Sequence, residues 1–294
     1  MADYMLSCES TVDVTPELLA SRNIEYVCFN YELDGVSLKD DFGQTNSPAQ
    51  LYAKMLAGAD ARTSQVSVGN YIEFFTPALE AGRDIVHVTL SSGISGTYGS
   101  AKIAADALSG KYPNQHLYIV DSLAASAGYG LLMDRLADLR DGGMSAADLV
   151  AWTEEHRLEL QHWFFSTDLT FFIRGGRISK AAGLIGGALK ICPVMDVAPD
   201  GSLAVKEKIR AKHRAESRVL EIMQQHASCG AGYPGKVFIS NSECLADAKS
   251  LAERIEYEFP HIDGKVQIFD IGATIGVHTG PGTVALFYWG DRRV

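Results

Sequence analysis

The stretch Thr89-Leu90-Ser91-Ser92-Gly93-Ile94-Ser95-Gly96-Thr97 leads from an apolar strand pattern into the helical pattern of residues 98–108. In a strand–turn–helix unit, the free N–H groups of the first helical turn and the helix dipole can hold a carboxylate or a phosphate. Serine and threonine hydroxyls add further donors, and Gly93 and Gly96 let the backbone approach a ligand closely. A tight turn in which serine only caps the helix is the alternative interpretation.

Strand and helix patterns alternate on both sides of this stretch. Ser47 stands before Pro48 and three residues before Gln50, which predicts a capped helix to about Gly58. Short apolar runs separated by Gly, Ser or Asn are predicted strands, namely Tyr4–Cys8, Ile24–Phe29, Asp84–Leu90 and His116–Val120. This alternation predicts an α/β fold with a parallel sheet in the first half of the chain.

The second half mixes helices with antiparallel and parallel strands. Amphipathic helices are predicted over 124–139 and 145–160, and a turn at 199–201 joins two strands into an antiparallel pair. The predicted strands are His162–Ser166, Ile191–Val197, Ala204–Ile209, Lys236–Asn241 and Lys265–Asp270, flanked by helices over 211–227 and 245–257. We expect a parallel-sheet α/β domain over 1–160 and a smaller mixed-sheet α/β domain over 161–294, with any ligand in the cleft between them.

The composition is typical of a globular chain with a large core. Of the 294 residues, 47% are hydrophobic and 21% are charged, which excludes a disordered or coiled-coil protein. The formal net charge of −10 disfavours nucleic acid as a partner, so an anionic ligand needs locally placed cations or N–H groups. No secretory signal pattern opens the sequence, and no apolar run approaches the ~20 residues of a membrane span, so we expect a cytoplasmic protein.

The sequence offers no starting point for a metal or a cofactor. Its five cysteines are scattered without a C-x-x-C pair, which argues against structural zinc and against a disulfide framework. It contains no Walker A, H-E-x-x-H or EF-hand pattern. The glycines after His278 do not open a helix behind a strand, so they do not make a dinucleotide fingerprint.

Several other segments are candidates for a site. Thr63-Ser64-Gln65-Val66-Ser67 places hydroxyls before a predicted helix over 68–79. Arg174-Gly175-Gly176-Arg177 puts two cations around a glycine pair, and a glycine-containing helix predicted over 180–190 indicates close packing or room for an apolar ligand. His278 is interpreted either as a structural hydrogen-bonding residue or as a switchable cation beside an anion. The sequence has one dense basic cluster, which comprises Lys206, Lys208, Arg210, Lys212, His213 and Arg214. It is interpreted either as a solvated face or as a docking patch, and the patch would bind an acidic partner or anionic lipid headgroups.

A nucleophilic serine is a competing hypothesis. Gly93-Ile94-Ser95-Gly96-Thr97 departs from the G-x-S-x-G elbow only in its last residue, which is Thr97. Ser95, Asp270 and His278 follow one another in the order found in α/β-hydrolases. Sequence order alone does not show that the three side chains meet. The threonine at position 97, where the elbow pattern has glycine, is the first argument against this triad.

Taken together, these segments resemble the DegV family, the fatty-acid-binding subunits of bacterial fatty acid kinase. The resemblance spans nearly the whole chain and is carried by Ser10-Thr11-Val12-Asp13, Thr63-Ser64-Gln65, Ser91–Thr97 with Ser100-Ala101, Val120-Asp121-Ser122, Gly175-Gly176-Arg177-Ile178, Asp200-Gly201 and His278-Thr279-Gly280-Pro281-Gly282. It implies a two-domain α/β fold that buries a long-chain fatty acid in a tunnel. It also implies that Thr63 and Ser95 hold the carboxylate.

The same resemblance implies roles for further residues. Near the carboxylate it places Ser64, Gly96, Thr97, Arg174, Arg177, His278 and Thr279. It implies that Lys206, Lys208 and Arg210 face an ATP-dependent kinase that supplies the phosphoryl group, so this chain would bear no catalytic residue and need no cofactor. Transient contact with a membrane surface fits the same basic cluster.

Two departures from the family pattern stand out. Glu9 occupies the acidic position of the usual D-S-T opening, and Val66 stands where the T-S-Q-P-S pattern has proline. The role of Glu9 is therefore open, whereas Thr63 and Ser95 are unaffected. The alternative function is a serine hydrolase that acts on acyl esters through Ser95 and His278. A DNA-binding regulator is opposed by the net charge.

Overall fold

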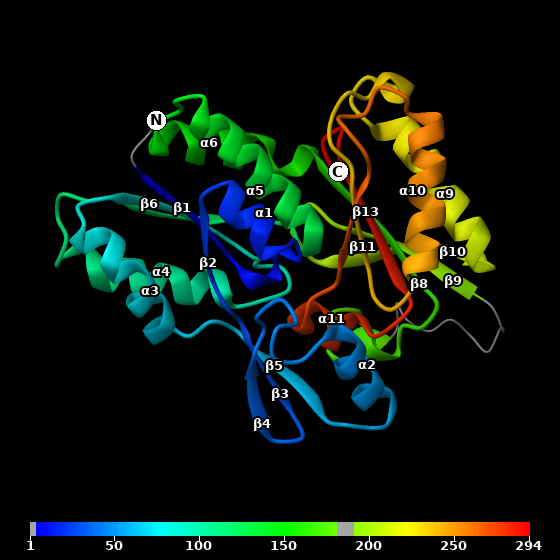
Figure 1. Ribbon diagram of the computed structural model, residues 1–294, viewed down its shortest axis with the longest axis horizontal. Helices are drawn as coiled ribbons and strands as arrows, with labels where there is room; N and C mark the ends of the chain where they lie inside the picture. Colours follow the sequence, from blue (N-terminus) through cyan, green and yellow to red (C-terminus); the bar gives the residue numbers. More distant parts are fainter. Residues whose placement is uncertain (1–3, 181–190) are drawn as a thin grey trace.

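Three β-sheets and their helices form the protein, whose computed structural model describes residues 4–180 and 191–294 (Figure 1). The first sheet is parallel, as predicted, with the order β2-β1-β6-β7. Its strands are β1 (Tyr4–Glu9), β2 (Ile24–Val27), β6 (Asp84–Thr89) and β7 (Leu117–Asp121). Helices α3 (Val68–Glu80) and α4 (Thr97–Ser109) lie below this sheet in the view of Figure 1, and α5 (Ser126–Asp141) and α6 (Ala146–His156) lie above it.

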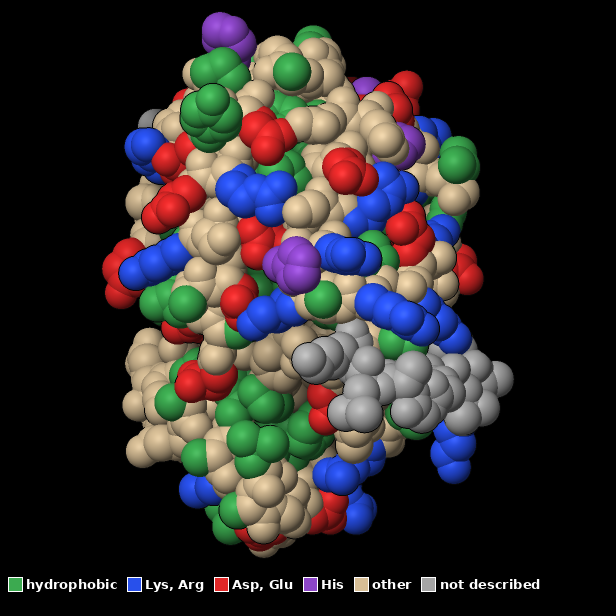
Figure 2. All heavy atoms as spheres, turned by 90° about the vertical axis from the view of Figure 1, so that its right-hand side faces the viewer, with side chains coloured by type: hydrophobic (Ala, Val, Ile, Leu, Met, Phe, Trp, Pro, Cys, Tyr) green, Lys and Arg blue, Asp and Glu red, His purple; other side chains and the backbone are tan. Residues whose placement is uncertain are grey.

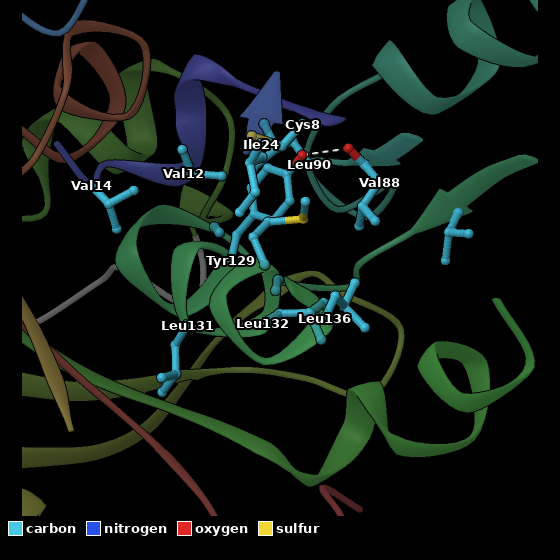
Figure 3. Packing of buried hydrophobic residues seen from close by; sticks show 14 of the residues in the cluster. Cys8, Val12, Val14, Ile24, Val88, Leu90, Tyr129, Leu131, Leu132 and Leu136 are labelled. Atoms are coloured by element: carbon cyan, nitrogen blue, oxygen red, sulfur yellow. Dashed lines mark hydrogen bonds between the residues drawn. The ribbon is translucent and has the colours of Figure 1, made fainter. Parts of the chain in front are cut away.

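Helix α5 is enclosed by two sheets. Its residues from Ser126 to Asp134 are all buried, because the parallel sheet lies on one side and strands of the second sheet contact the other. Figure 3 shows apolar side chains of β1, β6 and α5 pointing toward one another, with the Tyr129 hydroxyl donating a hydrogen bond to the Val88 carbonyl. This core fixes the end of β6, from which the loop 90–96 departs, and the end of β1 beside it.

The second sheet has six strands in the order β10-β9-β8-β13-β11-β12. They are β8 (Leu160–Ser166), β9 (Ile191–Val197), β10 (Leu203–Arg210), β11 (Phe238–Asn241), β12 (Gln267–Asp270) and β13 (Thr283–Trp289). The antiparallel pairing of β9 with β10 confirms the prediction from the turn at 199–201, and β11 pairs with β12 in parallel. Helices α9 (Lys212–His226) and α10 (Leu245–Glu258) cover its outer face (Figure 1).

A small third sheet, which was not predicted, has the order β4-β3-β5. Its strands are β3 (Asn30–Leu33), β4 (Val36–Lys39) and β5 (Ala61–Ser64). Helices α2 (Pro48–Leu56) and α11 (Ala273–Thr279) lie beside it at the bottom of Figure 1, around a core that includes Tyr31, Tyr52 and Val277. The small sheet therefore brings an early segment of the chain against a late one.

The remaining elements are short. They are helices α1 (Pro16–Ser21) and α7 (Thr170–Arg174) and the 3₁₀ turns Ser10–Val12, Arg157–Glu159 and Gly230–Gly232. The helix predicted over 145–160 ends at His156, and a 3₁₀ turn leads into β8 at Leu160. The helix predicted over 180–190 lies outside the described residues, apart from Lys180.

Candidate functional site

Thr63 and His278 meet although 215 positions separate them in the sequence. Thr63 is on β5 and His278 is in the last turn of α11, and Thr63 Oγ1 lies 2.8 Å from His278 Nε2. The other ring nitrogen, Nδ1, is buried and has no hydrogen-bond partner in the described part of the chain. Burial and the neighbouring Arg177 guanidinium lower the pKa of His278 to about 4, so the imidazole is neutral at neutral pH.

Ser95 lies in the loop between β6 and α4, where the sequence predicted an anion site. The Ser95 backbone N–H donates to the Ser91 carbonyl at 3.1 Å, and the Thr97 N–H donates to Ser95 Oγ at 3.3 Å. The Arg177 guanidinium donates to the Ile94 carbonyl through Nε at 3.1 Å and through Nη2 at 2.8 Å. Arg177 thus joins this loop to the turn that contains the glycine pair.

A cavity of about 210 Å³ adjoins both groups. Of the residues singled out in the sequence, Thr63, Gln65, Ser95, Gly96, Arg177, His278 and Thr279 line it. The rest of the lining is mainly apolar and includes Phe29, Leu90, Phe164, Phe172, Val197, Leu203, Ile275, Ala285 and Phe287. The arrangement is a polar group of side chains beside an apolar chamber, which suits a ligand with a charged head and a hydrocarbon tail.

Strand alternation explains the apolar chamber. Phe164 on β8 is opposite Ala285 on β13 in the antiparallel register, and both side chains face the cavity. The intervening residues Phe165, Val284 and Leu286 belong instead to the core beneath α9 and α10. One face of the sheet therefore supplies the cavity wall while the other face anchors it.

Three residues that the family resemblance places near the carboxylate do not line the cavity. Ser64 is exposed, and its hydroxyl donates to the Asn30 carbonyl at 3.4 Å because successive strand residues face opposite ways. Thr97 is fully buried, and its hydroxyl donates to the Glu9 carboxylate at 2.8 Å. Arg174 is exposed, with its guanidinium 5.3 Å from the centre of the Phe171 ring.

The hypothetical triad is not assembled among these described residues. His278 Nε2 is directed to Thr63 rather than to Ser95. The Asp270 carboxylate accepts a hydrogen bond from Asn241 at 3.2 Å. His278 therefore has neither the nucleophile nor the carboxylate that the mechanism requires.

Two acceptors that sequence reasoning did not place also shape the site. The Asp40 carboxylate accepts the N–H groups of Ala273 at 3.1 Å and of Thr274 at 3.0 Å, and so holds the start of α11. The Glu9 carboxylate lies beneath the Ser95 loop. The sequence signal for Glu9 was its acidic position in the D-S-T-like opening, whereas nothing near Asp40 pointed to α11.

The predicted docking residues Lys206, Lys208 and Arg210 are exposed on β10, an edge strand. Figure 2 shows Lys and Arg side chains in a band across this side of the molecule, interspersed with acidic ones. Lys206 pairs with Asp196 at 3.2 Å. Charged side chains on an edge strand also prevent pairing with other chains, which is the structural alternative to docking.

Neither a metal-binding group of side chains nor a membrane-spanning helix is found among the residues that the structure describes. No group of three or more His, Cys, Asp or Glu residues is arranged to hold a metal ion among residues 4–180 and 191–294. In the same ranges, no helix has both the length and the apolar character needed to cross a membrane.

Comparison with known proteins identifies the family of the chain. The family model described as "Uncharacterised protein, DegV family" matches residues 6–291. The chain belongs to the DegV family. A DegV domain-containing protein of Clostridium perfringens is 34% identical over 295 residues, covering 100% of this chain and 99% of the relative.

Solved DegV structures share the fold. A fatty-acid-binding DegV family protein of Thermus thermophilus superposes with a TM-score of 0.87 at 25% identity, covering 98% of this chain and 100% of the other. The fatty acid kinase B3 protein of Streptococcus pneumoniae, solved loaded with linoleic acid, has a TM-score of 0.84 at 22% identity, covering 99% and 100%. These neighbours confirm the predicted α/β architecture.

Proposed function

We propose that this DegV protein binds a long-chain fatty acid in the cavity and presents its carboxylate to an ATP-dependent kinase for acyl-phosphate formation. The observation that carries the proposal is that the Thr63–His278 pair and Ser95 line one cavity whose remaining lining is mainly apolar. Relatives that were solved with fatty acids support it. Residues 1–160 would supply the carboxylate loops, and residues 161–294 would close the chamber around the tail.

The head of the ligand would be bound through hydroxyl groups. A carboxylate only accepts hydrogen bonds, so the Thr63 and Ser95 hydroxyls must donate to it. The Thr63 oxygen, 2.8 Å from His278 Nε2, is then free to accept a hydrogen bond from an Nε2–H group. Neutral His278 thus orients Thr63 as a donor, and Arg177 contributes positive charge while it holds the loop.

The tail would supply most of the affinity. Burial of one methylene contributes about 0.8 kcal/mol, so a chain of about sixteen carbons gains on the order of 10 kcal/mol before the costs of association. Few polar contacts are then needed at the head. Phosphoryl transfer would fall to the partner, and the exposed residues Lys206, Lys208 and Arg210 would contact that kinase or, transiently, an anionic membrane surface.

The test is native mass spectrometry of the purified chain, followed by denaturation and extraction of any bound small molecule. We expect a stoichiometric fatty acid, and we expect Thr63→Val and Ser95→Ala to weaken palmitate binding about tenfold or more, because each removes a donor to a charged group. Ser64→Ala is the matched control, since Ser64 is adjacent to Thr63 but exposed outside the cavity lining. Unchanged affinity in both site variants contradicts the assignment, and labelling of Ser95 by a fluorophosphonate would favour a hydrolase.

A further inference from the structure

The carboxylate of Glu9 binds both ends of the loop that carries Ser95. Oε2 accepts the N–H of Leu90, where the loop begins, at 2.7 Å. Oε1 accepts the hydroxyl of Thr97, where α4 begins, at 2.8 Å, and it also accepts the Tyr71 hydroxyl from α3. Glu9 is fully buried, so water does not compete for these hydrogen bonds.

This hydrogen-bonded group leads directly to the ligand side of the loop. The Thr97 N–H donates to Ser95 Oγ at 3.3 Å, and both Ser95 and Leu90 line the cavity. Glu9 itself is held from behind, because its backbone N–H donates to the Tyr129 hydroxyl at 3.1 Å, within the core drawn in Figure 3. One hydrogen-bonded path from the core to the Ser95 hydroxyl therefore runs through Glu9 and Thr97.

The length of the side chain matters in this position. An aspartate at position 9, which the family pattern usually has, would set its carboxylate back by about one C–C bond, ~1.5 Å. The buried Leu90 N–H cannot turn toward another acceptor, whereas the Tyr71 and Thr97 hydroxyls can also bond each other at 2.6 Å. A glutamate is thus fitted to this spacing in a way that an aspartate is not.

We infer that Glu9 is a positioning residue that fixes the Ser91–Thr97 loop through Thr97 and Leu90, and so directs the Ser95 hydroxyl toward the ligand carboxylate. The inference rests on the proposed fatty-acid-binding function. Glu9 does not line the cavity, so it acts through its neighbours rather than by contact with the ligand.

The charge of Glu9 gives this role a distinctive pH dependence. Burial raises the pKa of Glu9 to about 7, against the hydrogen bonds from Tyr71, Leu90 and Thr97. His87 Nε2 is 4.0 Å away and offers no positive charge at neutral pH, because burial lowers the pKa of His87 to about 3. The other titratable groups that act on Glu9 or face it are Asp121, Cys8 and Tyr129.

A fatty-acid carboxylate bound at Ser95 adds a second negative charge near Glu9, so binding favours the protonated form of Glu9. Palmitate affinity is then highest below the pKa of Glu9 and falls as the pH rises through about 7. A buried carboxylate remote from the ligand would not couple palmitate affinity to pH in this way, and the Glu9→Asp variant tests the positioning role separately.

The experiment compares palmitate affinity of the full chain, stripped of lipid, at about pH 6 and about pH 8.5. We expect the unsubstituted protein to bind at least about threefold more weakly at the higher pH, as for two charges that interact within a protein. Glu9→Gln keeps the length and one carbonyl acceptor for Leu90, so it should retain near-normal affinity and lose this pH dependence. Glu9→Asp should bind about tenfold more weakly, since it loses a hydrogen bond to a charged group.

Asp134→Asn is the matched control, because Asp134 is another buried carboxylate but pairs with Arg22 and Lys236 away from the cavity. It should leave both the affinity and its pH dependence unchanged. Normal affinity in Glu9→Asp, or an unaltered pH dependence in Glu9→Gln, overturns the inference. Failure of the unsubstituted chain to bind palmitate at either pH refutes the proposed function instead, which is a different result.

Discussion

His278→Gln should change how the stability of the protein depends on pH. Burial and Arg177 lower the pKa of His278 from 6.5 to about 4 in the folded state. Between about pH 6.5 and pH 4, His278 is therefore protonated in the unfolded chain but not in the folded chain. The folded state loses stability as the pH falls across this range. Glutamine does not titrate, and its side-chain amide can still donate to Thr63.

The linkage gives the magnitude of this effect. With the pKa at about 4 when folded and 6.5 when unfolded, the free energy of unfolding drops by about 2 kcal/mol between pH 7 and pH 5 through His278 alone. His87 and Glu9 also titrate differently on folding, but both proteins share them, so their contributions cancel in the difference.

The assay is urea unfolding of lipid-free protein at about pH 7, 6 and 5, with the free energy of unfolding taken from each transition. His278→Gln should gain about 2 kcal/mol relative to the unsubstituted protein between the highest and the lowest pH. Two parallel stability profiles would show that His278 is not a buried neutral imidazole, and would remove the reason for assigning it as the donor that orients Thr63.

Two other substitutions test how the site is held together. Asp40→Asn removes the charge that caps the N–H groups of Ala273 and Thr274. It should lower the free energy of unfolding by about 1 kcal/mol in urea unfolding, and it should weaken palmitate binding several-fold in a titration. Unchanged affinity would mean that α11 is positioned by its apolar packing alone. Gly93→Ala places a methyl group against the backbone of Gly201, so it should cost about 1–3 kcal/mol of stability in the same unfolding assay, and a normal transition midpoint would contradict the close approach.

Local sequence signals predicted the parts of the fold whose causes are local. Ser47 accepts a hydrogen bond from the Gln50 N–H at 3.3 Å, and the Gln50 side chain accepts the Ser47 N–H at 3.1 Å, so the predicted capping box is confirmed. The strand–loop–helix unit around Ser95 is likewise present, because apolar runs and glycines specify it within a few residues.

The small sheet and α11 were not predicted, because their local sequence patterns are short and the contacts that stabilise them join residues distant in sequence. The strands of the small sheet have four residues each, too few for a clear alternation. Helix α11 contains Gly276 among its seven residues, and its first N–H groups are satisfied by Asp40, which is 233 positions away from Ala273. Family resemblance named Thr63 and His278 as site residues, but only the tertiary structure shows that they bond each other.

The position of β13 has a consequence for the synthesis of the protein. This strand, residues 283–289, is inserted between β8 and β11, so the six-stranded sheet lacks an inner member until these residues have been made. His278 precedes it by only a few residues and contacts Thr63, which lies 215 positions earlier in the sequence. A nascent chain on the ribosome would expose the apolar wall without a closed chamber, and such long-range pairing folds slowly. If the chamber holds a fatty acid as proposed, loading would follow the synthesis of β13 rather than precede it.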